Sequence, residues 1–174
     1  MHNQEYQDLL KTACRMRFDI MKMAFNCGAH GAHIGGSLSA VDLLCVLYKR
    51  YLRLDPNDTT NGTRDRFVMS KAHSVMAQYA ALHQIGVLSD AEMNCAMITS
   101  NILYKHPRMN IAKGIEFSGG SLGQGVSLAV GTAHALKLKG NFTSRVYTML
   151  GDGECNEGSV WEAAAFATQY RLDN

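Results

Sequence analysis

The chain has 174 residues, of which 47% are hydrophobic, and a formal net charge of +2 at pH 7. This size and composition favour one soluble domain over residues 1–174, with a single substantial core. Lys and Arg are scattered rather than clustered, and no apolar stretch reaches the roughly 20 residues that cross a bilayer, so neither nucleic acid nor a membrane is an expected partner.

The first third of the chain reads as two helices around a glycine-rich loop. Apolar residues recur at helical spacing from Gln4 to Cys27, and Gly28 is placed to end that helix. The loop "GAHGAHIGGS" follows. Ser39, with Asp42 three residues later, is a capping-box signature and predicts a second helix through "VDLLCVLYKRYL".

The middle of the chain predicts a strand and two more helices. "DPNDTTNGTRD" is typical of a surface loop, and "RFVMS" after it of a short buried strand. "HSVMAQYAALHQIG" has helical spacing, with Gly86 as the stop, and Ser89 with Glu92 predicts the cap of another short helix. The aperiodic stretch from Thr99 to Gly120 is long for a connection, which favours a functional loop.

The last part repeats the alternation. The glycine cluster "SGGSLGQG" opens an apolar helix, "RVYTML" reads as a strand, and "SVWEAAAFATQY" reads as the final helix. Strands that alternate with helices, with glycine-rich turns at strand ends, predict an α/β fold with a mainly parallel sheet. Ligands of such folds bind at the carboxyl ends of the strands, where Gly151, Asp152 and Gly153 are expected to stand.

An aspartate between two glycines at a strand end suits a divalent cation that carries phosphates. Mg²⁺ prefers one or two carboxylates, with carbonyls, water and phosphate at its other positions. The N-terminus of the next helix favours the same anion. Asp152 is therefore a candidate metal ligand, although Asp-Gly is also a common turn dipeptide and the tripeptide alone is compatible with a simple tight turn.

The cysteines indicate a reducing compartment. The five cysteines form no CxxC pair, and their odd number fits reduced thiols better than a disulfide framework. The first 20 residues lack the continuous apolar segment of a signal peptide. We expect a cytoplasmic protein in which the cysteines serve mostly as small core residues.

Five motifs, in order, resemble the amino-terminal half of transketolase: "HIGG", "DRFVMSKAH", "KHP", "GGSLGQG" and "GDGECNEGSVWEAAAFA". The resemblance runs from about Leu9 to Asn174, and "HIGGSLSAVDLL" is most similar to split transketolases, which consist of two subunits. It implies the three-layer, doubly wound thiamine diphosphate-binding fold, incomplete at its C-terminal end. It also implies a metabolic transferase that moves a two-carbon ketol unit from a ketose phosphate to an aldose phosphate.

The resemblance assigns roles to the strand-end turn and the second glycine cluster. It implies that Asp152 binds the Mg²⁺ or Ca²⁺ that anchors the diphosphate of thiamine diphosphate, and that the backbone of Gly153, next to Gly151 in the same turn, touches phosphate. Gly120, Leu122 and Gln124 match the loop that passes over the cofactor. Glu157 matches an acidic residue at the family's dimer interface that couples the cofactors.

Three histidines also match family positions. The resemblance implies that His33 and His106 bind substrate hydroxyls and assist proton transfer, and that His73 lies by the diphosphate and the reacting carbon. An imidazole titrates near neutral pH and both donates and accepts hydrogen bonds, as this chemistry requires. Glu162 also matches the interface, but Ser159 and Glu162 equally form a capping-box pattern, so its role stays open.

Other parts of the family pattern are expected to lie outside these residues. They are the second metal ligand, an asparagine beyond Asn174, and the pyrimidine-binding domain. We therefore expect the partner to be a C-terminal transketolase subunit, in a homodimer or heterotetramer. The alternatives are a non-catalytic truncated module and a related enzyme, such as deoxyxylulose-phosphate synthase or dihydroxyacetone synthase.

Overall fold

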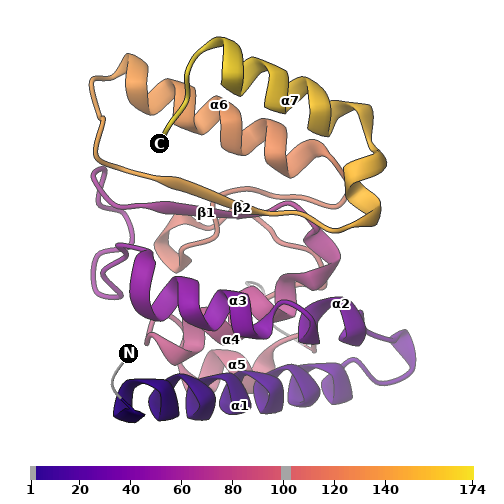
Figure 1. Cartoon of the computed structure of the whole chain (residues 1–174). Helices are drawn as coiled ribbons and strands as arrows, with labels where there is room; N and C mark the ends of the chain where they lie inside the picture. Colours follow the sequence, from indigo (N-terminus) through magenta and orange to yellow (C-terminus); the bar gives the residue numbers. More distant parts are fainter. Residues whose placement is uncertain (1–2, 99–102) are drawn as a thin grey trace.

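The computed structural model describes residues 3–98 and 103–174 and shows helices alternating with strands (Figure 1). In chain order the elements are α1 (Asn3–Asn26), α2 (Ile34–Leu38), α3 (Val41–Val46), β1 (Arg66–Met69), α4 (Val75–Gln84), α5 (Asp90–Cys95), α6 (Gln124–Leu138), β2 (Val146–Met149) and α7 (Gly158–Gln169). Shorter helical turns occupy Gly28–His30, Leu47–Tyr51, Ala72–Ser74, Ile111–Lys113 and Gly153–Asn156. No helix of the described ranges is long and apolar enough to cross a membrane.

The elements form three layers around a parallel sheet. β1 and β2 pair in parallel, with Arg66 opposite Val146 and Met69 opposite Met149. Figure 1 shows α6 and α7 on one face of the sheet and α1 to α5 on the other. The predicted α/β fold is confirmed, and within the described residues its sheet has two strands. The other edge of β2 meets the end of the chain, because the Val146 N–H donates to the Asn174 carbonyl at 2.7 Å.

The main core lies between α1, α3, α4 and one face of the sheet. The apolar stripe of α1 supplies Met16 and Ile20, and α4, which is buried on all sides from Val75 to Leu82, supplies the fully buried Tyr79. Phe67 of β1 packs edge-on against Tyr48, with ring centroids 5.5 Å apart. α4 is thus fixed behind the strand that leads to His73.

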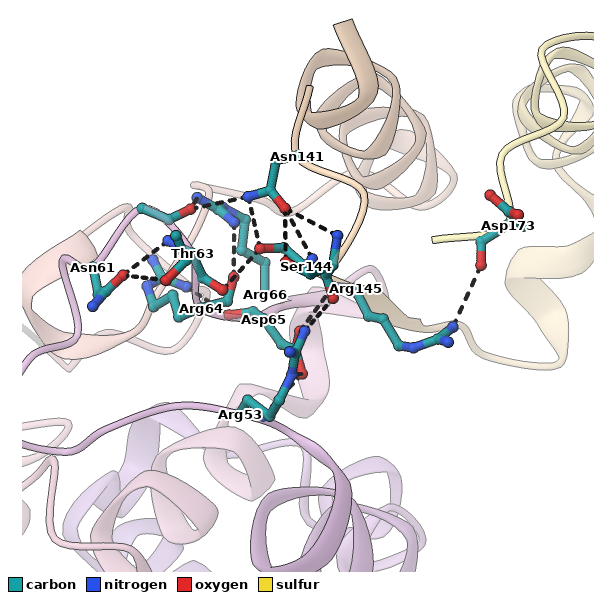
Figure 2. A network of polar contacts seen from close by, with 12 residues as sticks. Arg53, Asn61, Thr63, Arg64, Asp65, Arg66, Asn141, Ser144, Arg145 and Asp173 are labelled. Carbon is teal, nitrogen blue, oxygen red and sulfur yellow. Dashed lines mark hydrogen bonds and ion pairs between the residues drawn. The ribbon is translucent and has the colours of Figure 1, made fainter. Parts of the chain in front are cut away.

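A polar network fixes the amino-terminal ends of both strands (Figure 2). The buried Asp65 carboxylate accepts hydrogen bonds from Arg53 Nη2 at 2.6 Å and from the backbone N–H groups of Arg53 at 3.0 Å and Arg145 at 2.8 Å. Asn141 ties the turn before β2, where its Nδ2 donates to Ser144 Oγ at 2.8 Å. These contacts tie the segment before β1 to the segment before β2 at this end of the sheet.

Of the predicted capping boxes, the one at Ser89 and Glu92 forms completely. The one at Ser39 and Asp42 is wrong. The preceding glycine-rich stretch is itself partly helical, as α2, so Ser39 has helical rather than extended backbone and its Oγ donates to the Gly36 carbonyl at 3.0 Å. The Ser159 pattern does not cap α7 either, because this helix already begins at Gly158.

The cysteines are all free thiols, as expected, but only Cys27 and Cys45 are buried. Cys14 and Cys95 lie on exposed helix faces, and Cys155 lies in the exposed turn after β2. The expectation of mostly core cysteines is therefore wrong, because an apolar neighbourhood in the sequence does not decide which face of a helix a side chain occupies.

Candidate active site at the carboxyl ends of the strands

The chain leaves β1 and β2 at the same edge of the sheet. The backbone N–H groups of Ser70 and Lys71, just after β1, both donate to the Met149 carbonyl at the end of β2, at 3.0 and 3.2 Å. This pairing sets the segment after β1 beside the turn of Gly151–Gly153. Loops from elsewhere in the chain then surround this edge.

Three imidazoles from three distant segments meet here. His33 directly precedes α2, His73 lies in the short turn after β1, and His106 lies in the described part of the long loop. The ring centroid of His33 is 5.4 Å from that of His73 and 6.0 Å from that of His106. The structure therefore brings together the three histidines that sequence analysis selects.

Hydrogen bonds from side chains to backbone carbonyls hold the loop that carries His106. Lys105 Nζ donates to the carbonyls of His30 and Gly31 at 2.9 and 3.0 Å, which joins this loop to the one before His33. On the other side of Lys105, the Tyr79 hydroxyl donates to the Tyr104 carbonyl at 3.1 Å. These contacts place His106. The function predicted for the long stretch stays a prediction, and its residues 99–102 lie outside the described residues.

A cavity of about 230 Å³ opens beside the histidines. His33 and His73 line it, together with the apolar side chains of Met76 and Met97 and the amine of Lys105. A site of this kind combines an apolar wall with a few convergent polar groups, which is the usual make-up of a small-molecule pocket.

His73 is the most enclosed of the three imidazoles. Burial lowers its pKa, and the neighbouring His33 and Lys71 act in the same direction. The ring is therefore neutral at pH 7, able to donate from one nitrogen and accept at the other. Close packing fixes the ring, since a Cβ added at Gly36 would lie 3.1 Å from His73 Cδ2 and 2.9 Å from Ser74 Oγ.

Asp152 lies at the tip of the turn after β2 with its side chain exposed, and it does not cap the short helical turn that follows. Lys71, 9% exposed, lies between this turn and the first glycine loop, because its Nζ donates to the Gly36 carbonyl at 3.3 Å. Burial lowers the pKa of Lys71, while the charges of Asp152 and Glu154 oppose that shift. Sequence reasoning did not single out Lys71, although its place directly after a buried strand was a usable signal.

The second glycine cluster packs against both strand ends. Gly123 has a φ of +81°, and a Cβ there would lie 2.2 Å from Ser159 Oγ; a Cβ at Gly125 would lie 2.4 Å from Ser70 Cα. These two glycines therefore serve close packing. Gly120, Leu122 and Gln124 are exposed at the same edge, and their cofactor contacts remain predictions.

Glu154 is the main residue that sequence reasoning missed. Its carboxylate is 1% exposed and accepts three hydrogen bonds, from Ser70 Oγ at 2.5 Å, from the Gly123 N–H at 2.8 Å and from the Gly151 N–H at 2.9 Å. The tripeptide Gly151–Gly153 drew attention to Asp152, whereas the signal for Glu154 was an acidic residue directly after this glycine-flanked turn.

The two candidate interface acids lie on the side of α7. Glu157 directly precedes α7 with extended backbone and an exposed side chain. Glu162 is exposed one turn further along and lines a shallow groove between α6 and α7 with Phe166. Their pairing with a second chain remains a prediction.

The residues present fit a diphosphate carried by a divalent cation. Across the described ranges, no group of three or more His, Cys, Asp or Glu side chains could hold a metal ion by itself. One carboxylate suffices for Mg²⁺ when phosphate oxygens and water complete its coordination. The side chain of Asp152 is exposed and therefore accessible to such an ion. A Cβ added at Gly120 or Gly153 would meet nothing within 4 Å, so both backbones are open to a ligand.

Comparison with known proteins decides the family. Residues 11–174 match the family model for the thiamine diphosphate binding domain of transketolase. The chain belongs to the transketolase family. It therefore carries that family's thiamine diphosphate-binding domain.

Similar proteins include proteins named as transketolase subunits. The chain is 38% identical over 173 residues to an apulose-4-phosphate transketolase subunit of Actinobacillus succinogenes, with 99% of this chain and 62% of that protein covered. It is 39% identical over 171 residues to human transketolase, which covers 98% of this chain and 27% of that protein. The structure superposes on transketolase from Campylobacter jejuni with a TM-score of 0.86 at 31% identity, covering 97% of this chain and 27% of that one. The chain thus spans less than two thirds of each of these relatives.

Proposed function

We propose that the chain is the N-terminal subunit of a split transketolase and transfers a two-carbon ketol unit from a ketose phosphate to an aldose phosphate in the cytoplasm. The observation that carries this proposal is the meeting of His33, His73 and His106 beside a cavity of about 230 Å³, at the sheet edge that also presents Asp152. Thiamine diphosphate supplies the carbanion chemistry when bound, and the protein supplies orientation and charge.

Each group of the site has a proposed task. Asp152 holds Mg²⁺ or Ca²⁺, and the open backbones of Gly120 and Gly153 face the cofactor. The exposed imidazoles of His33 and His106 bind the hydroxyl groups of the sugar phosphates and assist proton transfer. The neutral ring of His73 lies by the diphosphate and the reacting carbon, where it can donate a hydrogen bond from one nitrogen and accept one at the other.

The proposed enzyme needs a second chain that carries the pyrimidine-binding domain. Support comes from the similarity to proteins named as subunits. The layer of α6 and α7 also exposes large apolar side chains that another chain would cover: Leu128 at 38%, Trp161 at 66%, Phe166 at 39% and Tyr170 at 50%. We propose a homodimer or a heterotetramer with two copies of each subunit.

Reconstitution tests this function. The purified chain with thiamine diphosphate and Mg²⁺ should transfer no ketol units between a ketose phosphate and an aldose phosphate. Addition of a pyrimidine-domain transketolase subunit should create the activity, and Asp152→Ala should remove it. Activity of the isolated chain would contradict the division of labour, and a reconstituted pair that binds the cofactor without any transfer would favour a non-catalytic module.

A further inference from the structure

Glu154 joins three separate segments of the active-site edge. Ser70 lies just after β1, Gly123 lies in the second glycine cluster, and Gly151 lies in the turn after β2. All three donate to the same carboxylate, two of them to Oε1 and the third to Oε2. With 1% exposure and both oxygens occupied, this carboxylate has no room to bind a ligand directly.

The directions of the hydrogen bonds require an acceptor on both sides. Ser70 Oγ accepts the Val126 N–H at 2.9 Å, so its one proton is directed at Glu154. The other two partners are backbone N–H groups, which only donate. A glutamine at position 154 has the same shape, but its NH₂ group would face at least one of these donors, and that bond would be lost.

We propose that Glu154 is a positioning residue: by anchoring the amides of Gly151 and Gly123, it fixes the metal-binding turn and the cofactor loop relative to each other and so sets the affinity for thiamine diphosphate with Mg²⁺. The inference rests on the proposed function, because it concerns the same ligand. Gly151 directly precedes Asp152, and Gly123 directly precedes Gln124, so each anchored amide adjoins a residue predicted to meet the metal or the cofactor.

The test compares two variants that each neutralise a buried carboxylate. Glu154→Gln acts at the carboxyl ends of the strands, and Asp65→Asn acts at their amino-terminal ends, with its side chain also 1% exposed. Calorimetry on the full chain measures the Mg²⁺-dependent Kd for thiamine diphosphate, at a temperature well below both melting points. We expect Glu154→Gln to weaken binding by about 10-fold to 100-fold, as loss of an outer-shell partner does in metal sites, and Asp65→Asn to change it less than about twofold.

Amide hydrogen exchange of the ligand-free chain gives a second readout. Glu154→Gln should speed exchange at Gly151, Gly123 or both, whereas Asp65→Asn should leave these amides as in the wild type. If Glu154→Gln does not fold, Ser70→Ala takes its place, because it removes one donor and keeps the carboxylate; several-fold weaker binding with faster exchange at Gly123 is then expected.

Failure of the positioning role of Glu154 and failure of the proposed function give different results. If the wild type binds thiamine diphosphate with Mg²⁺ and Glu154→Gln binds it with the same Kd, the positioning role is overturned and the proposed function stands. Equal weakening in Asp65→Asn would also overturn it, because the effect would then follow general stability. A wild-type chain that binds no thiamine diphosphate with Mg²⁺, alone or with its partner, would overturn both.

Discussion

Gly125→Ala is the substitution whose effect on stability follows most directly from the packing. A Cβ at this position would lie 2.4 Å from Ser70 Cα and 2.8 Å from Ser70 Cβ. Since a main-chain atom cannot rotate away, either the first turn of α6 or the end of β1 must shift. Overpacking of this kind costs about 1–3 kcal/mol.

The shift also disturbs a hydrogen bond. The Val126 N–H donates to Ser70 Oγ at 2.9 Å across the same contact, and such a bond contributes about 1 kcal/mol. We therefore expect Gly125→Ala to lower the free energy of unfolding by about 2–4 kcal/mol. That is a large part of the roughly 5–15 kcal/mol that stabilises a typical domain.

Equilibrium denaturation in urea measures the loss, and Gly131→Ala is the matched control. Gly131 lies in the same helix, but a Cβ there would meet nothing within 4 Å. Without a clash, replacing this helical glycine by alanine should raise the free energy of unfolding by about 0.5–1 kcal/mol. If Gly125→Ala were as stable as Gly131→Ala, the close packing of α6 on β1 would be refuted.

Two further predictions concern titratable groups. Burial raises the pKa of Asp65, but the hydrogen bonds from Arg53 and from the Arg145 backbone outweigh it and hold the pKa below its usual range. The resulting stabilisation is complete above about pH 4 and is lost as the pH falls through the lowered pKa of the folded state. Asp65→Asn should therefore lower the free energy of unfolding by about 2–3 kcal/mol at pH 7. It should also flatten the acid limb of the curve of stability against pH, measured by urea denaturation. An unchanged acid limb would contradict this. For His73, whose pKa burial lowers with help from His33, an NMR titration should give a midpoint below the usual value of about 6.5, and a midpoint at or above it would contradict the described enclosure.

Much of the fold could be predicted because local patterns and tertiary structure agree. The apolar stripe between Gln4 and Cys27 gave α1 within a residue at each end, and the Ser89 cap formed as expected. The capping patterns failed at Ser39 and Ser159, because both serines have helical backbone and an N-cap needs an extended one. Ser39 directly follows α2, and Ser159 lies inside α7.

The candidate site could be predicted only where single residues stood in motifs. His33, His73 and His106 were selected by the family resemblance, and the structure places them together. The partnership of Glu154 with Ser70 could not be predicted, since it depends on the register that sets the end of β1 beside the turn after β2. Such contacts between segments leave no periodic trace in the sequence.

Calorimetric titration of the chain with thiamine diphosphate, with and without Mg²⁺, is the most direct measurement of whether Asp152 anchors the cofactor through a metal ion. The wild type should bind more tightly when Mg²⁺ is present, and Asp152→Ala should lose that gain while keeping the wild-type melting temperature, because the side chain is exposed. If Mg²⁺ raised the affinity for thiamine diphosphate equally in the wild type and in Asp152→Ala, the account would be contradicted.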